Sequence, residues 1–245
     1  MKPCPKGGHP MQPSAWFRGV LLVSLIVPAG PALAQSKNLA PGFVALSVGA
    51  KVAIMPTDIE LFSISAGGVA EPKADWTDAA SRHFKQALIE KKKKALKLDV
   101  VELEEKDADD FADVNALHGA ISRAISMHHF GPGFLNLPTK DGKLDWSLGE
   151  STRAIKKATG ADYALFTWVR DSYTSAERVA TMIALALVGV GVGGGVQTGY
   201  ASLVELETGR VLWFNRLARG SGDLREAEKA AETIDALLAN FPAPK

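Results

Sequence analysis

Three histidines, His118, His128 and His129, are the side chains of this chain best suited to hold a metal ion or relay a proton. A helix rises about 1.5 Å per residue, so His118 and His128 on one helix would stand roughly 15 Å apart, too far to share an ion. The adjacent pair points in different directions, and no H-x-x-x-H pattern occurs. We therefore expect no metal site, and we predict that His128 and His129 cap carbonyl groups at a helix end before Gly131.

Carboxylates crowd residues 102–113, where a catalytic acid–base pair could be sought. Their position before an amphipathic segment instead indicates a solvated loop and the acidic start of a helix. The serine nucleophile motif G-x-S-x-G is absent. We expect a protein that is not an enzyme; a hydrolase with dispersed catalytic residues would require a deep polar cleft holding two carboxylates or a histidine–carboxylate pair.

Residues 189–194 formally match the dinucleotide-binding pattern G-x-G-x-x-G. The match follows an apolar run and precedes a predicted strand, whereas the dinucleotide motif opens a helix. No lysine followed by serine or threonine completes a phosphate-binding loop. The sequence therefore predicts no cofactor.

Residues 1–34 have the pattern of a secretory signal peptide. A short apolar run at 19–27 follows basic residues, and Ala32-Leu33-Ala34 is a cleavage site, so we expect processing after Ala34. The only cysteine, Cys4, lies in this segment, which leaves the processed chain without disulfides. We predict a soluble or peripherally attached periplasmic protein, and the net charge of +1 argues against binding nucleic acid.

The remaining residues, 35–245, are predicted to form a single α/β domain with a mixed β-sheet and helices packed on it, in the chain order β-α-β-α-α-β-β-β-α. Residues 57–73 are expected to be a loop with an apolar middle, either folded on the core or covering a binding groove. The expected strands lie within 43–55, 98–103, 161–173, 200–206 and 211–215, and the expected helices begin near Asp75, Phe111, Ser147 and Asp223.

The last two strands form a hairpin around Thr208-Gly209, and they carry apolar residues on both faces. A ribbon that is apolar on both faces needs cover on both sides. We therefore predict that this hairpin lies in the centre of the sheet.

Residues 178–196 form a glycine-rich apolar insertion without a charge between Arg178 and Glu205. Three interpretations remain open: a packed loop and helix, an element that contacts a membrane or a partner, and a membrane span. Together with the apolar loop, the insertion supplies our candidate contact residues, namely Phe62, Ile64, Val69, Met182, Ile183, Leu185, Leu187, Val190 and Val192.

Three short motifs resemble the superfamily of curli secretion channels and penicillin-binding-protein activators. They are Val52-Ala53-Ile54-Met55-Pro56, Gly160-Ala161-Asp162-Tyr163-Ala164-Leu165, and the hairpin from Leu203 to Trp213, within roughly residues 50–240. The chain departs from the pattern in having Glu205 in place of aspartate and no lipid-attachment cysteine after its apolar run. The resemblance implies a non-enzymatic envelope component, such as a channel subunit or a regulator of wall synthesis.

Channel members of that group insert strands into the outer membrane from near this point in the fold. Such strands alternate apolar and polar residues, which residues 178–196 do not. We therefore expect a binding or assembly protein of the cell envelope, with an envelope protein, a second copy or a membrane surface as its partner. A carrier of a small apolar ligand is an alternative, and it would require an enclosed apolar cavity.

Overall fold

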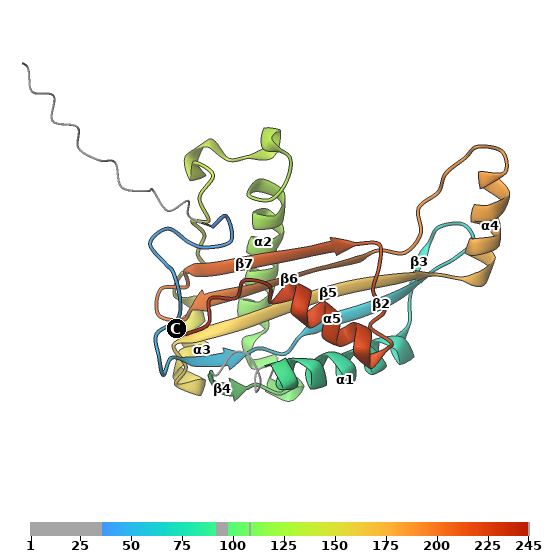
Figure 1. The fold of residues 1–245 in the computed structure, drawn as a ribbon. Helices are drawn as coiled ribbons and strands as arrows, with labels where there is room; N and C mark the ends of the chain where they lie inside the picture. The colour runs from blue at the N-terminus through green and yellow to red at the C-terminus, as the bar shows by residue number, and fades with distance from the viewer. Residues whose placement is uncertain (1–35, 92–97, 108, 245) are drawn as a thin grey trace, which may run out of the picture. The chain divides into compact units, whose positions relative to one another are not determined.

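The computed structural model describes residues 36–91, 98–107 and 109–244 (Figure 1). The predicted signal peptide and part of the lysine-rich end of the first helix lie outside these residues. These described residues cluster as one compact unit.

Within the described residues, the fold combines seven strands with five α-helices and several short 3₁₀ turns. The strands are β1 (Lys51–Ile54), β2 (Asp58–Ile64), β3 (Ala70–Pro72), β4 (Asp99–Glu102), β5 (Tyr163–Thr174), β6 (Gln197–Glu205) and β7 (Val211–Arg219). The helices are α1 (Ala74–Lys91), α2 (Ala112–His128), α3 (Arg153–Thr159), α4 (Ala176–Ala186) and α5 (Ala227–Leu237).

The long strand β5 lies at the centre of a mixed sheet. Strands β1 and β2 lie in succession along one edge of β5, both parallel to it, and β6 lies antiparallel along the other edge. Strand β4 extends the sheet beside β1, β3 beside β2, and β7 beside β6. The predicted mixed sheet with helices packed on it is confirmed.

Helices cover both faces of this sheet. Leu165 and Val169 of β5 face α1 and α5, whereas the alternate residues Ala164 and Phe166 face the side of α2 and α3. Because side chains alternate between the faces of a strand, covering both faces makes β5 apolar from Tyr163 to Val169, except at Thr167.

The C-terminal hairpin is buried as predicted, but its place in the sheet differs from the prediction. Leu203, Leu212 and Trp213 are at most 3% exposed. Strand β6 is internal, whereas β7 is the last strand of its side of the sheet. Residues 38–40 cover part of the outer edge of β7, with Ala40 N donating to Leu212 O at 2.8 Å. The prediction that both strands are central was therefore wrong for β7. Apolar residues on both faces of a strand indicate that the strand is buried, but they do not determine its position in the sheet.

The expectation of a loop at residues 57–73 was also wrong, because the structure forms β2 and β3 there. Ile59 and Leu61 are alternate residues of β2, and both point into the core. Strand β2 pairs with β5 along the same edge as β1, just beyond the end of β1. The first strand is correspondingly short, and residues 43–50 before it form neither strand nor helix.

Two helices begin later than their expected capping residues. Ser147 Oγ accepts from Gly149 N at 2.9 Å, and a 3₁₀ turn precedes α3. Asp223 accepts from Arg225 N at 3.0 Å, and α5 starts only at Ala227. Both polar residues therefore hold turns in place of helix starts.

Candidate contact surface

The predicted insertion forms an extension that we call the arm, residues 175–196. It consists of α4 and a glycine-rich return segment, residues 189–196, and it leaves the sheet at the end of β5 and re-enters it at β6. In Figure 1, α4 lies beyond the ends of the strands, beside the turn that joins β2 to β3.

Local sequence explains where α4 begins and ends. Ser175 caps the helix by accepting from Arg178 N at 3.1 Å, and Glu177 in the first turn suits the positive end of the helix dipole. At the other end, Gly189 adopts a left-handed φ of 79°. Val190 N donates to Leu185 O and Gly189 N to Ala186 O, which is the Schellman arrangement of a helix end.

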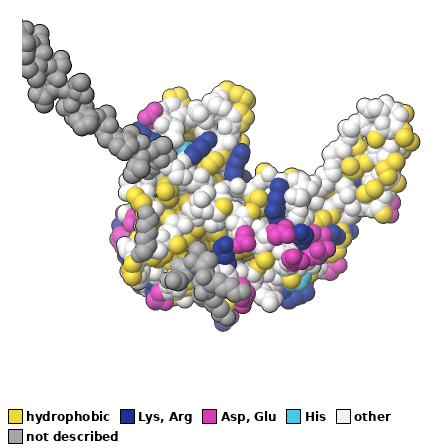
Figure 2. All heavy atoms as spheres, in the orientation of Figure 1, with side chains coloured by type: hydrophobic (Ala, Val, Ile, Leu, Met, Phe, Trp, Pro, Cys, Tyr) yellow, Lys and Arg dark blue, Asp and Glu magenta, His cyan; other side chains and the backbone are white. Residues whose placement is uncertain are grey.

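One side of α4 faces inward and the other faces outward. Arg178, Thr181, Met182 and Leu185 are half-buried against the neighbouring segments. No residue of α4 is fully buried, and Glu177 in its first turn is exposed. From Val179 onward the outward residues are all apolar. They are Val179, Ala180, Ile183, Ala184, Ala186 and Leu187, of which Ile183 is 60% and Leu187 84% exposed. Apolar side chains cover much of the arm on the face shown in Figure 2.

Arg178 joins the arm to the β2–β3 turn. Its guanidinium donates to Ala66 O and to Gly193 O, each at 3.2 Å. These bonds connect α4, the turn at residues 65–69 and the return segment. The arm is therefore held as a defined body rather than as a free loop.

A buried polar network lies where the arm joins the sheet. Asp171 of β5 accepts from Gln197 of β6 at 2.7 Å and from Tyr173 Oη at 2.5 Å. Gln197 in turn accepts from Arg219 of β7 at 2.9 Å and from Thr233 of α5 at 3.1 Å. Burial raises the pKa of Asp171. Sequence analysis missed this network, because its members come from four separate elements.

The structure divides the nine candidate contact residues into two groups. Val69, Ile183, Leu187 and Val190 are exposed, whereas the others are half-buried within or beneath the arm. The half-buried residues are Phe62, Ile64, Met182, Leu185 and Val192. Val179 and Val188 are also exposed, at 43% and 73%, but were not among the candidates. Their position in the same apolar run could have identified them as contact residues.

None of the helices in the described residues is long and apolar enough to cross a membrane. Within residues 178–196, α4 ends at Ala186 and the glycine-rich residues that follow form no helix.

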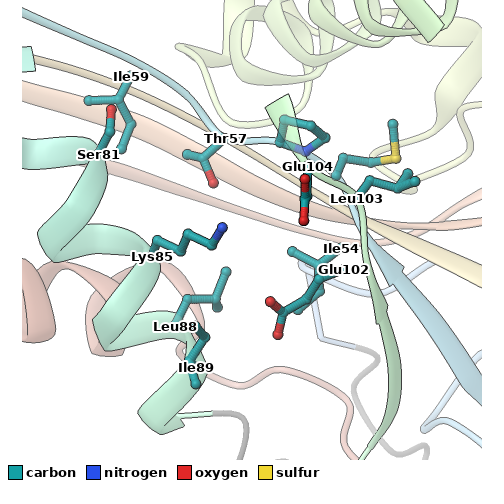
Figure 3. Close-up of a pocket in the computed structure, with 12 residues that line it drawn as sticks. Ile54, Thr57, Ile59, Ser81, Lys85, Leu88, Ile89, Glu102, Leu103 and Glu104 are labelled. Carbon is teal, nitrogen blue, oxygen red and sulfur yellow. The ribbon is translucent and has the colours of Figure 1, made fainter. Parts of the chain in front are cut away.

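A small pocket lies at the carboxyl ends of the parallel strands β1 and β4, next to α1 (Figure 3). Its volume is about 150 Å³, and its walls combine apolar side chains with Lys85 on one side and Glu102 and Glu104 on the other. A hydrogen bond from Lys106 lowers the pKa of Glu104, which keeps that carboxylate ionised at neutral pH and unsuited to act as a general acid. The pocket is open to solvent and partly polar, so it is not an enclosed apolar cavity.

The histidines occupy structural positions. His118 Nε2 lies 2.6 Å from Ser202 Oγ and 3.1 Å from Ser122 Oγ, and all three residues are buried in the core. His128 bonds Leu135 O at 2.8 Å and His129 bonds Lys37 O at 2.7 Å, so they hold loop carbonyls and not those of the helix end. Among the described residues, no group of three or more potential ligands from His, Cys, Asp and Glu could hold a metal ion.

No protein-family model matches this sequence, and no curated protein matches it significantly. Several solved structures are similar over most of the chain. The PelC dodecamer from Paraburkholderia phytofirmans has 16% identity and a TM-score of 0.39, over 83% of this chain and 94% of PelC. A lipoprotein from Neisseria meningitidis has 11% identity and a TM-score of 0.32, over 78% of this chain and 99% of its own.

The C-terminal domain of LpoB from Escherichia coli has 13% identity and a TM-score of 0.29, over 74% of this chain and 88% of that domain. Scores at this level do not define a function.

Proposed function

We propose that this protein is a non-enzymatic binding or assembly component of the bacterial cell envelope, located in the periplasm, and that the arm is its contact surface. The main observation behind the proposal is the outward face of α4, where several apolar residues are exposed next to one another. The helix that carries them is fixed in place by the hydrogen bonds of Arg178. Contiguous apolar surface that remains exposed is typical of a site that binds a partner or a membrane.

The location rests on the predicted signal peptide and on the absence of cysteine after Cys4. The three motifs that resemble the curli-channel and penicillin-binding-protein-activator superfamily support an envelope role. An envelope protein, a second copy of this chain and a membrane surface are the partners that such a face would fit.

Fractionation of expressing cells tests the proposal. We expect the wild-type protein to remain with the envelope until detergent or carbonate releases it, because the arm holds it there. A variant carrying both Ile183→Asp and Leu187→Asp should shift to the soluble periplasm, since a charge on this face opposes burial.

The control replaces two apolar residues elsewhere that are at least as exposed, Val48→Asp with Phe134→Asp, which are 81% and 86% exposed in the wild type. This control should fractionate as the wild type does. Release of the wild-type protein with the soluble periplasm as a monomer, without an envelope-bound pool, would refute the proposed function.

A further inference from the structure

We propose that the arm binds a lipid surface. On this surface α4 lies in the interfacial plane and is held by apolar contact alone. This inference rests on the proposed function and specifies the partner of the same surface. The face is formed by α4 together with Val188 and Val190 at its C-terminal end.

The width of the apolar face favours lipid. Successive residues of a helix are about 100° apart, so the six outward residues from Val179 to Leu187 cover about half of the circumference of α4. A helix that enters a protein groove typically presents a narrower stripe of anchors. A fluid layer of acyl chains can surround the whole half-cylinder.

The chemistry of the face also favours lipid over a protein. Protein interfaces carry roughly one hydrogen bond per 100–200 Å² and a polar rim. Between Val179 and Val196 the only polar side chain is Thr181. It lies on the inward side, where it donates to Glu177 O at 2.9 Å. Apart from the exposed Glu177 in the first turn of α4, the face therefore offers a partner protein no side chain with which to form hydrogen bonds or ion pairs.

The length of α4 and the backbone that follows it limit the depth of insertion. Eleven residues make a helix of about 16 Å, roughly half of the hydrocarbon thickness of a bilayer. The return segment contains no regular secondary structure at residues 190–196. Its backbone groups need water, and irregular backbone is not found facing hydrocarbon. The arm can therefore lie at headgroup depth with its outward face toward the acyl chains.

The missing charges determine the lipid preference. Many interfacial helices carry lysine and arginine on the polar face and so prefer anionic lipids. In α4 the charged residues are Glu177 and Arg178, and Arg178 is held inward by Ala66 and Gly193. Binding should therefore be independent of anionic lipid and of salt.

Flotation with vesicles tests this inference on purified, exported protein. We expect the wild type to float with phosphatidylcholine vesicles, to the same extent when phosphatidylglycerol is included and when the salt concentration is raised. The Ile183→Asp, Leu187→Asp variant should lose about tenfold or more of its vesicle-bound fraction, because two buried apolar contacts are replaced by charges. All variants carry the same N-terminus, so any contribution of residues 1–34 cancels.

The Val48→Asp, Phe134→Asp control should float like the wild type. Equal flotation of the arm variant and the control would overturn the inference, and so would wild-type protein that does not float. A requirement for phosphatidylglycerol would overturn it as well. If light scattering instead finds a dimer that the arm variant disperses, a second copy is the occupant.

The two proposals fail in different ways. Protein that is held in the envelope of cells through the arm but does not float with vesicles contradicts the lipid occupant and leaves the proposed function in place. Protein that is monomeric and has no envelope-bound pool contradicts the proposed function itself.

Discussion

His118 illustrates how a residue with catalytic potential becomes a core residue. It stacks on Phe166 with ring centroids 4.1 Å apart, and its Nε2 shares the two serine hydroxyls. Ser202 is fully buried, so this serine–histidine contact cannot meet a substrate. Burial lowers the pKa of His118 to about 3, which keeps the imidazole neutral in the folded protein.

This pKa predicts a loss of stability in acid. In the unfolded chain the histidine has its ordinary pKa of about 6.5, so below that pH the unfolded state binds the extra proton. The stabilisation from His118 is complete above pH 6.5 and declines as the pH falls toward 3. We expect the free energy of unfolding, measured with urea, to fall by about 2 kcal/mol between pH 7 and pH 5 because of this residue.

The His118→Gln variant, which keeps a hydrogen-bonding side chain, should lack that part of the pH dependence. The His83→Gln variant should retain it, because His83 lies outside this cluster on α1, near Leu224. An identical pH profile for His118→Gln and the wild type would contradict this account of His118.

Gly209 provides a second prediction at the residue level. Its φ is +70°, and a Cβ atom would lie 2.1 Å from Gly149 O. Gly209→Ala should therefore lower the free energy of unfolding by about 3 kcal/mol or more, from left-handed strain and backbone collision together. Gly142→Ala is the matched control, because φ is +66° there and the space around it is open. Gly142→Ala should lower the free energy of unfolding by only about 1 kcal/mol. If a denaturant titration shows the same loss for both variants, the backbone collision at Gly209 is refuted.

At the level of elements, the sequence predicted those whose apolar pattern is long and undisturbed. Helix α2 and strand β5 lie close to their expected ranges. Strand β2 was missed because it is flanked by Pro56 on one side and Gly67-Gly68 on the other, which read as a loop. The alternating apolar residues Ile59 and Leu61 were nevertheless visible in the sequence. The sequence did not indicate that this segment pairs with β5.

Arg178 is predicted to control the order of the arm. Replacing it with methionine keeps a long side chain and removes the bonds to Ala66 and Gly193. Hydrogen exchange measured by mass spectrometry should speed up about tenfold at residues 65–69 and 189–195, while β5 and β6 keep their protection. Arg216→Met, which loses a contact with Ser126 O outside the arm, should leave the arm unchanged. Unchanged exchange at residues 189–195 in Arg178→Met would show that other contacts order the arm.

At the level of the whole compact unit, the core and the arm are separable. The two apolar clusters that stabilise the sheet contain no residue of α4. The register of β5 and β6 ends with Asp171 opposite Gln197, and three more residues in the same register would place Thr174 opposite Gly194. A two-residue Asn-Gly turn in place of residues 175–193 would therefore close a regular hairpin.

We expect that shortened protein to remain folded, with a melting temperature within about 5 °C of the wild type in circular dichroism. A much larger decrease would mean that the arm is part of the core.

Composition alone indicated that the arm is unusual, because residues 179–204 contain no charge. It could not indicate which side of α4 faces inward, since that depends on Arg178 reaching two distant carbonyls. The polar network at Asp171 and Gln197 was equally beyond reach, because it brings four elements together.

The most direct test of the central claim measures the surroundings of the outward face of α4. Cys4 is the only cysteine, so Ile183→Cys in a Cys4→Ser background accepts a single polarity-sensitive fluorophore. Lys229→Cys on α5 is the matched control. On adding the labelled proteins to envelope membranes, we predict a blue shift and protection from an aqueous quencher at position 183 alone. A probe at position 183 that remains as accessible to the quencher as the probe at position 229 would contradict the account.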